Sequence, residues 1–177
     1  MRNIIRNVKV FTEEGRFVYG AVVTEGTVIR QILERGAEGE SLIASLGDEV
    51  IDGGGCYCIP GMIDIHLHGC RGQDICDGTS EALEVITAWE ASVGVTAIAP
   101  AVMTLPVDKL ESVLENAADF CRVREKEKWF HSAELVGINM EGPFISPGRK
   151  GAQDARHIVP CDSELYRRFQ QAAGGRI

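Results

Sequence analysis

Two histidines stand one residue apart at the end of the apolar stretch CIPGMIDIHLHG, which runs from Cys58 to Gly69. Residues i and i+2 of a β-strand point to the same side of a sheet, so the imidazoles of His66 and His68 can face one site. Imidazole nitrogens commonly bind zinc and similar divalent metals. The spacing therefore predicts part of a metal site, the alternative being a strand that simply ends in hydrogen-bonded histidines.

A carboxylate directly follows another apolar segment, in the sequence ELVGINMEGPFI. A carboxylate buried at a strand end costs free energy unless it is paired or binds a cation. A divalent metal held by two histidines and a carboxylate would lower the pKa of a bound water and make that water a nucleophile. We predict that His66, His68 and Glu141 bind such a metal, with zinc as the expected ion. The alternative for Glu141 is a salt bridge.

Three other polar residues have less specific surroundings. His131 lies in a polar connection and is expected at the surface. His157 lies in the long loop SPGRKGAQDARH, which is basic at two positions, and it could approach a substrate. Asp64 lies inside the first apolar strand, where we expect it to find a hydrogen-bond partner, with the glycines that precede this strand as candidates.

The six cysteines predict neither a disulfide framework nor a structural zinc site, because no CxxC pair occurs. Free thiols are the default in a reducing compartment. One of them, Cys70, follows His68 by two residues and could border the metal site.

From Ile59 onward, apolar strand-like segments alternate with amphipathic helices. The strands are expected at 59–69, 95–104 and 134–145, and the helices at 80–94, 105–128 and 162–175. Thr79 or Ser80 and Asp162 can cap helix starts, and Pro106 suits a first turn. The expected buried faces are Ala82, Val85, Ile86, Trp89 and Val93 in the first helix, and Leu110, Val113, Leu114, Ala117 and Cys121 in the second.

This alternation predicts an α/β fold with a parallel sheet, and the pattern alone leaves an open sheet and a barrel both available. In either fold the chemistry lies at the carboxyl ends of the strands, where His66, His68 and Glu141 stand. No GxGxxG or Walker-type loop follows a strand, which disfavours nucleotide binding.

The first part of the chain reads as short β segments, at 4–12, 16–26, 27–34 and near the sequence GDEVID, with a polar connection after residue 34. Strands at this spacing with glycine turns predict a small antiparallel sheet or sandwich. We therefore expect a small β domain over residues 1–57 and the α/β domain over residues 58–177.

Composition excludes several classes of protein. The formal net charge is -8, and the sequence has no basic stripe. Both features argue against nucleic acid as the main partner. No apolar run approaches the roughly 18 residues of a membrane span, and the first residues lack the pattern of a secretory signal. A cytoplasmic protein without a membrane partner is expected.

Three stretches, PGMIDIHLHG, GVTAIAPAVMT and NMEGPFISPGRKGAQ, resemble the amidohydrolase superfamily, and within it the N-acetylglucosamine-6-phosphate deacetylase family. The first motif occurs in many amidohydrolases, whereas MEGPF followed by KGA is much more specific. The resemblance covers essentially the whole chain. It implies a metal-dependent (β/α)8 barrel, preceded by a small β-sandwich, that hydrolyses the acetamide of an amino-sugar phosphate.

The resemblance also implies roles for residues. Glu141 matches the ligand of the principal metal, while His66 and His68 match a second metal site that only some members have, so one or two ions are expected. Ala152 and Gln153 match positions that touch the sugar, although many members have histidine in place of Gln153. The general base and further ligands are expected beyond residue 177. No catalytic residue is therefore assigned here, and the chain is expected to be an incomplete N-terminal portion.

Two other functions are also compatible with this sequence. Another amidohydrolase could act on a cyclic amide, but such enzymes often have a lysine carbamate where Glu141 stands. The chain could also be a non-catalytic, truncated module that oligomerises. Three parallel strands cannot close a barrel, and an uncovered strand edge invites pairing with another chain, so a homo-oligomer is expected.

Overall fold

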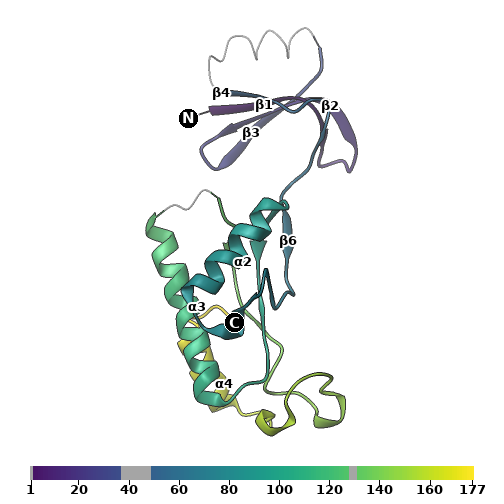
Figure 1. The fold of residues 1–177 in the computed structure, drawn as a ribbon. Helices are drawn as coiled ribbons and strands as arrows, with labels where there is room; N and C mark the ends of the chain where they lie inside the picture. Colours follow the sequence, from purple (N-terminus) through teal and green to yellow (C-terminus); the bar gives the residue numbers. More distant parts are fainter. Residues whose placement is uncertain (1, 37–48, 128–130) are drawn as a thin grey trace. The chain divides into compact units, whose positions relative to one another are not determined.

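A computed structural model describes residues 2–36, 49–127 and 131–177 (Figure 1). The chain divides into two compact units, Met1–Pro60 and Gly61–Ile177. The polar connection predicted after residue 34 falls largely on residues 37–48, outside the described residues. No helix in the described part of the chain is both long enough and apolar enough to cross a membrane.

The first unit contains one sheet with the strand order β3-β2-β1-β4, and β5 also pairs with β1. Its strands are β1 (Arg2–Phe11), β2 (Phe17–Glu25), β3 (Val28–Glu34), β4 (Glu49–Asp52) and β5 (Tyr57–Cys58). The predicted strands are confirmed. The antiparallel prediction is correct for β1, β2 and β3 but wrong for β4 and β5, which run parallel to β1. β5 follows β4 closely in the chain and continues beside β1 in the same direction.

The second unit is the predicted alternation of strands and helices. Its strands are β6 (Met62–Asp64), β7 (Gly69–Cys70), β8 (Gln73–Asp74), β9 (Val95–Ile98), β10 (Ala101–Val102), β11 (Glu134–Leu135) and β12 (Asn139–Met140). Its helices are α2 (Ser80–Ser92), α3 (Val107–Glu127) and α4 (Ser163–Ala172), with 3-10 turns η1 (Ile75–Asp77), η2 (Pro147–Arg149) and η3 (Ala155–His157).

Parallel pairing is confirmed in two places, the three-stranded order β11-β9-β6 and the pair β10-β12. Each predicted strand is shorter than expected or broken into two pieces. The second strand breaks at Pro100, which has no N–H to donate, and the third breaks at Gly137. The strand direction nevertheless continues across each break, which carries the chain to the edge where the polar residues lie.

The helix caps follow the predictions. The Thr79 side chain accepts a hydrogen bond from the backbone N–H of Ala82, and Asp162 accepts from the N–H groups of Glu164 and Leu165. These contacts satisfy backbone donors that have no partner within the helix.

The buried face predicted for α2 is correct for Ala82 and Ile86 and wrong for three other residues. Val85, Trp89 and Val93 are exposed, whereas the helix buries Ala82, Leu83, Ile86, Thr87 and Glu90. The contact face is therefore rotated toward the row that starts at Leu83 and recurs at i+3, i+4 and i+7. The Trp89 ring instead lies 4.6 Å from the guanidinium of Arg71, a cation–π contact at the surface.

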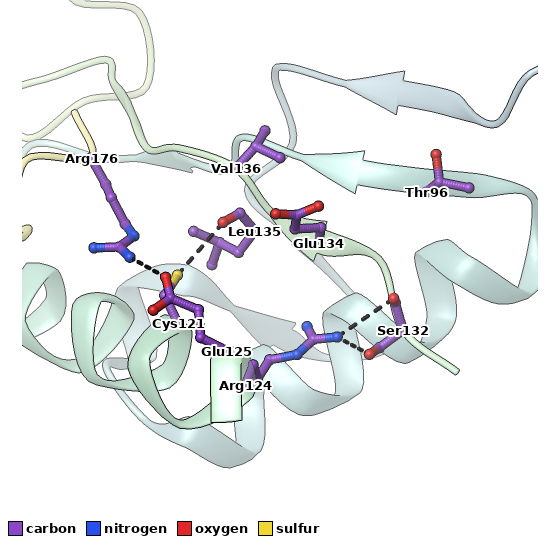
Figure 2. Close-up of a pocket in the computed structure, with 9 residues that line it drawn as sticks. All are labelled: Thr96, Cys121, Arg124, Glu125, Ser132, Glu134, Leu135, Val136 and Arg176. Atoms are coloured by element: carbon purple, nitrogen blue, oxygen red, sulfur yellow. Dashed lines mark hydrogen bonds and ion pairs between the residues drawn. The ribbon is translucent and has the colours of Figure 1, made fainter. Parts of the chain in front are cut away.

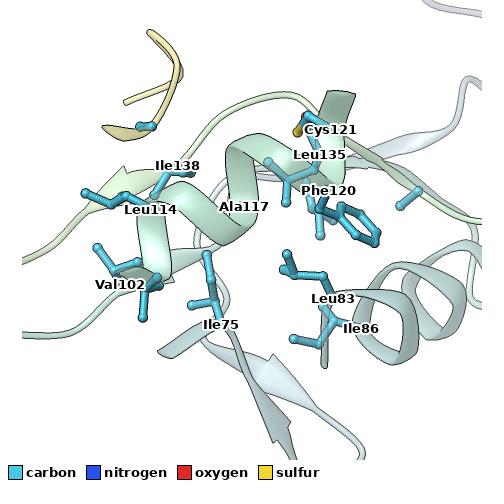
Figure 3. Close-up of a cluster of buried hydrophobic side chains, with 14 of the residues drawn as sticks. Ile75, Leu83, Ile86, Val102, Leu114, Ala117, Phe120, Cys121, Leu135 and Ile138 are labelled. Carbon is cyan, nitrogen blue, oxygen red and sulfur yellow. The ribbon is translucent and has the colours of Figure 1, made fainter. Parts of the chain in front are cut away.

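The buried face predicted for α3 is confirmed at all of its positions. Figure 3 shows Leu114 of this helix near Val102 and Ile138. The same cluster includes Ile75 from η1, Leu83 and Ile86 from α2, and Phe169 from α4. One continuous core therefore fixes the helices against the strands that carry the polar residues.

Replacing Leu114 with alanine should lower the free energy of unfolding by about 2–5 kcal/mol, because the side chain is fully buried and its loss leaves a cavity. Urea denaturation followed by circular dichroism would measure this. Val123→Ala is the matched control on the same helix, where the side chain is 48% exposed, and it should change stability by less than about 0.5 kcal/mol. Equal losses in the two variants would contradict the assignment of the core.

Candidate metal centre

The carboxyl ends of three strands meet through backbone hydrogen bonds. The N–H of Ala101 donates to the carbonyl of Leu67 at 2.7 Å, and the N–H of Asn139 donates to the carbonyl of Pro100 at 3.0 Å. β10 therefore lies between β12 and the segment that follows β6. Parallel pairing brings equivalent strand ends to one edge, so residues that follow β6 and β12 become neighbours.

His66, His68 and Glu141 come together at this edge, as their positions in the sequence predict. The Glu141 Oε2 atom lies 3.4 Å from Nε2 of His66 and 3.3 Å from Nε2 of His68. One ligand atom from each residue lies within 4.8 Å of the others. The two imidazole rings are nearly perpendicular, at 86°, with their centroids 5.5 Å apart.

The environment of the carboxylate fits a cation. Glu141 Oε2 is buried and accepts no hydrogen bond from the described residues, since neither nearby imidazole nitrogen lies in hydrogen-bond geometry. A buried carboxylate oxygen without a partner is costly, and native proteins seldom leave one unsatisfied. A divalent metal coordinated by the two nitrogens and this oxygen would supply the missing partner, so the donor set matches zinc chemistry.

Each imidazole also has a partner at its other nitrogen. His68 Nδ1 lies 2.9 Å from the carbonyl oxygen of Ala101. His66 Nδ1 lies 3.3 Å from Nδ2 of Asn139, and the same Nδ2 donates to the carbonyl of Ile65 at 3.2 Å. The sequence contained a signal for Asn139, because it precedes Glu141 by two residues and so faces the same side of the strand.

Asp64 has a structural role next to this cluster. Its Oδ1 accepts a hydrogen bond from the backbone N–H of His66 at 2.9 Å. The expected hydrogen-bond partner therefore exists, but it is the backbone of the histidine motif and not a preceding glycine. This bond holds the backbone at the point where the chain leaves β6. On α2, burial and then the charge of Asp64 raise the pKa of Glu90.

Gly142 lets the segment that carries Glu141 pack against Thr104, which follows β10. A Cβ atom at Gly142 would overlap Thr104 Oγ1 and lie 2.9 Å from both Cα and N of Thr104. No larger residue fits without moving the backbone next to Glu141. The close approach of these two segments therefore depends on glycine at this position.

The loop after β12 is anchored on the same threonine. Gln153 is only 3% exposed, and its Oε1 accepts a hydrogen bond from the N–H of Thr104 at 2.6 Å. Lys150 Nζ donates to the carbonyl of Gln153 at 2.9 Å. The neighbouring Ala152 is exposed. The sugar contacts predicted for Ala152 and Gln153 remain predictions, and the structure adds an anchoring role for the glutamine.

The remaining histidines are not part of the cluster. His131 is exposed, as expected. His157 Nε2 lies 3.9 Å from Oδ2 of Asp154, a residue that also binds the Arg156 guanidinium. Hydrogen bonds from the Arg156 side chain and backbone hold the pKa of Asp154 below its usual range. Any contact of His157 with a substrate remains a prediction.

All six cysteines are free, in agreement with the prediction. Cys70 is not among the three residues that converge as potential ligands. Cys76 accepts a hydrogen bond from the N–H of Met103 at 3.3 Å, and burial raises its pKa to about 11.

A pocket of about 580 Å³ lies where β9 and β11 begin (Figure 2). Its two arginines are already engaged within the protein. Arg124 donates to the backbone oxygens of Ser132 and Ala133, and Arg176 pairs with Glu125 at 2.8 Å. The two arginines of this pocket therefore support the packing of α3 against β11. The cluster of His66, His68 and Glu141, at the opposite ends of the strands, is the stronger candidate site.

Curated relatives match nearly the whole chain. It is 34% identical over 176 residues to an N-acetylglucosamine-6-phosphate deacetylase of Bacillus subtilis, and 29% identical over 174 residues to one of Lysinibacillus sphaericus. Each match covers 98% of this chain but 42% of the relative. An N-acetylgalactosamine-6-phosphate deacetylase of Escherichia coli O157:H7 is 25% identical over 159 residues, which are 86% of this chain and 36% of the relative. No family model matches the chain.

Solved structures agree on the fold. An N-acetylglucosamine-6-phosphate deacetylase from Pasteurella multocida superposes with a TM-score of 0.81 at 22% identity, covering 100% of this chain and 43% of that one. The enzyme from Mycobacterium smegmatis gives 0.73 at 19% identity, covering 100% and 45%. The resemblance inferred from the motifs is confirmed: the chain is similar to the N-terminal part of N-acetylglucosamine-6-phosphate deacetylases and spans about two-fifths of their length.

Gly142→Ala should weaken zinc binding about 10- to 100-fold, because the added methyl group must push Glu141 away from the histidines. Isothermal titration with zinc would measure the affinity. Gly148→Ala is the matched control in the following loop, where the nearest atom to the added Cβ would be 3.9 Å away, and it should bind zinc normally. Normal affinity in both variants would contradict the positioning role of Gly142.

Cys161 should react with iodoacetamide at pH 8 at least about tenfold faster than Cys76. Cys161 is exposed. Cys76 has a raised pKa of about 11, so at pH 8 almost all of Cys76 is the unreactive thiol and not the thiolate. Mass spectrometry of the native protein after timed labelling would give both rates, with urea-unfolded protein as the control in which the difference disappears. Equal rates in the native protein would contradict the burial of Cys76.

Proposed function

We propose that this chain is the N-terminal part of a metal-dependent hydrolase that converts N-acetylglucosamine 6-phosphate to glucosamine 6-phosphate and acetate. The observation that carries the proposal is the convergence of His66, His68 and Glu141 at the carboxyl ends of parallel strands. That is where α/β enzymes hold their reacting groups. The names of the curated relatives supply the substrate.

The three ligands would hold zinc, as one ion at Glu141 or as two ions with His66 and His68 completing the second site. When bound, zinc would polarise an amide carbonyl and lower the pKa of a bound water. The protein's part is to keep the three donor atoms aimed at one point. The hydrogen bond from the His66 backbone N–H to Asp64 and the packing of Gly142 on Thr104 serve this purpose.

The substrate would lie beside the loop that follows β12. We propose that Ala152 and Gln153 contact the sugar, with Gln153 held in place by Thr104. Its Nε2 atom is buried and donates no hydrogen bond within the described part of the chain. In the reaction, a water oxygen bonds to the acetamide carbonyl carbon, the C–N bond breaks, and the sugar nitrogen leaves as an amine after gaining a proton. We assign no general base among these 177 residues.

The proposed architecture of the whole enzyme is a (β/α)8 barrel in which β6, β9–β10 and β11–β12 form the first three strand positions. The first unit would contribute to a β-sandwich. A cytoplasmic homo-oligomer is part of the same proposal, because pairing with a second copy would cover exposed strand edges. Two alternatives can be distinguished from this proposal. The carboxylate of Glu141 disfavours a cyclic-amide hydrolase, because such enzymes often have a lysine carbamate at this position. A non-catalytic oligomeric module would bind no metal.

The decisive experiment is acetate release from N-acetylglucosamine 6-phosphate with zinc supplied. We compare the 177-residue chain with a protein extended to the length of the curated relatives. The extended protein should release acetate, and its Glu141→Gln variant should lose at least about 100-fold in rate while keeping the fold, because it loses the carboxylate ligand. The short chain should bind zinc without turnover.

N-acetylgalactosamine 6-phosphate serves as the second substrate, because a relative with that name also matches the chain. Faster turnover of the galacto sugar would change the assigned substrate and keep the reaction. Absence of acetate release from either sugar by the extended, zinc-loaded protein would refute the proposed function.

A further inference from the structure

Two backbone N–H groups lie just beyond the end of β10 and are bound by side chains from other loops. The N–H of Met103 donates to Cys76 Sγ at 3.3 Å, and the N–H of Thr104 donates to Gln153 Oε1 at 2.6 Å. Cys76 lies in η1, which follows the histidine motif, and Gln153 lies in the loop after β12. The segment after β10 is therefore held from both sides.

These two bonds satisfy donors that strand pairing does not reach. β10 ends at Val102, so neither N–H belongs to the parallel pair of β10 with β12. Thr104 is only 3% exposed, and a buried N–H without an acceptor is costly. A backbone N–H can only donate, so the oxygen of the Gln153 amide must face it. Residue 153 therefore has to supply an acceptor atom at this place.

Thr104 in turn is the residue on which the carboxylate segment packs. A Cβ atom at Gly142 would overlap Thr104 Oγ1 and lie 2.9 Å from both Cα and N of Thr104. The contact therefore includes the same backbone nitrogen that Gln153 binds. Gly142 directly follows Glu141 in the chain, so a shift of Thr104 changes the position of this carboxylate relative to the histidines.

We infer that Gln153 is a positioning residue for Glu141, because it fixes Thr104 at the place where Gly142 packs against it. Cys76 supports the same segment from the other side by binding the neighbouring N–H. The inference rests on the proposed function, since the position of Glu141 matters for the proposed metal site. It gives Gln153 a second role, carried by Oε1, beside the proposed contact of this residue with the sugar.

The bond between Thr104 and Gln153 can be read in the metal-free chain by amide hydrogen exchange, followed residue by residue with ¹H–¹⁵N NMR. The Thr104 N–H should be protected in the wild type. Gln153→Met keeps the length of the side chain but lacks the acceptor oxygen, so Thr104 should exchange at least about tenfold faster. Gln153→His offers an acceptor nitrogen and should restore the protection. Fast exchange of Thr104 in the wild type, or unchanged exchange in Gln153→Met, would overturn the inference.

The effect on Glu141 is then read in two ways. In the metal-free chain, Gln153→Met should shift the amide resonances of Glu141 and Gly142. With zinc supplied, Gln153→Met should weaken binding about tenfold, and Gln153→His should bind within about threefold of the wild type. Rescue by histidine separates the loss of the acceptor from the loss of glutamine itself. Unshifted resonances, or normal zinc affinity in Gln153→Met, would overturn the positioning role.

Gln170→Met is the matched control. Gln170 lies on α4, where its Oε1 accepts a hydrogen bond from the N–H of Ile177 at 3.1 Å, so this variant loses the same kind of bond at another place. It should leave the resonances of Glu141 and the zinc affinity unchanged, and equal changes in both methionine variants would overturn the inference. If the wild-type chain bound no zinc, the proposed function would fail, while the resonances of Glu141 would still decide the role of Gln153.

Discussion

A buried carboxylate oxygen without a hydrogen bond is the constraint on which the rest of this site depends. Glu141 Oε2 lies 3.4 Å from Nε2 of His66 and 3.3 Å from Nε2 of His68, but it has no hydrogen bond to a described residue. Such an arrangement costs free energy in the absence of a cation. It persists because the surrounding backbone is fixed independently, by the pairing of β10 with β12 and by the packing of Gly142 on Thr104.

The same backbone contacts connect the core to the site. The strands that end at the cluster are short, and two of the three predicted strands are broken, so their own pairing supplies few hydrogen bonds. The helices compensate through one continuous core, in which α3 covers β10 and the segment before β12 through Leu114, Val102 and Ile138. The packing of apolar side chains thus holds the backbone that places the polar groups of the cluster close together.

The polar groups around the three ligands also come from distant segments. His68 Nδ1 lies 2.9 Å from the carbonyl oxygen of Ala101, and His66 Nδ1 lies 3.3 Å from Nδ2 of Asn139. Two histidines that stand one residue apart in the sequence therefore have different neighbours in the folded chain.

The sequence by itself determined the alternation of strands and helices, their caps, the buried face of α3 and the three residues of the cluster. These follow from local chemistry: periodicity, capping side chains and the placement of polar residues after apolar runs. The buried face of α2, the parallel direction of β4 and β5 and the anchoring of Gln153 on Thr104 were decided only by tertiary structure. Each depends on contacts between segments distant in sequence, whose directions no local pattern encodes.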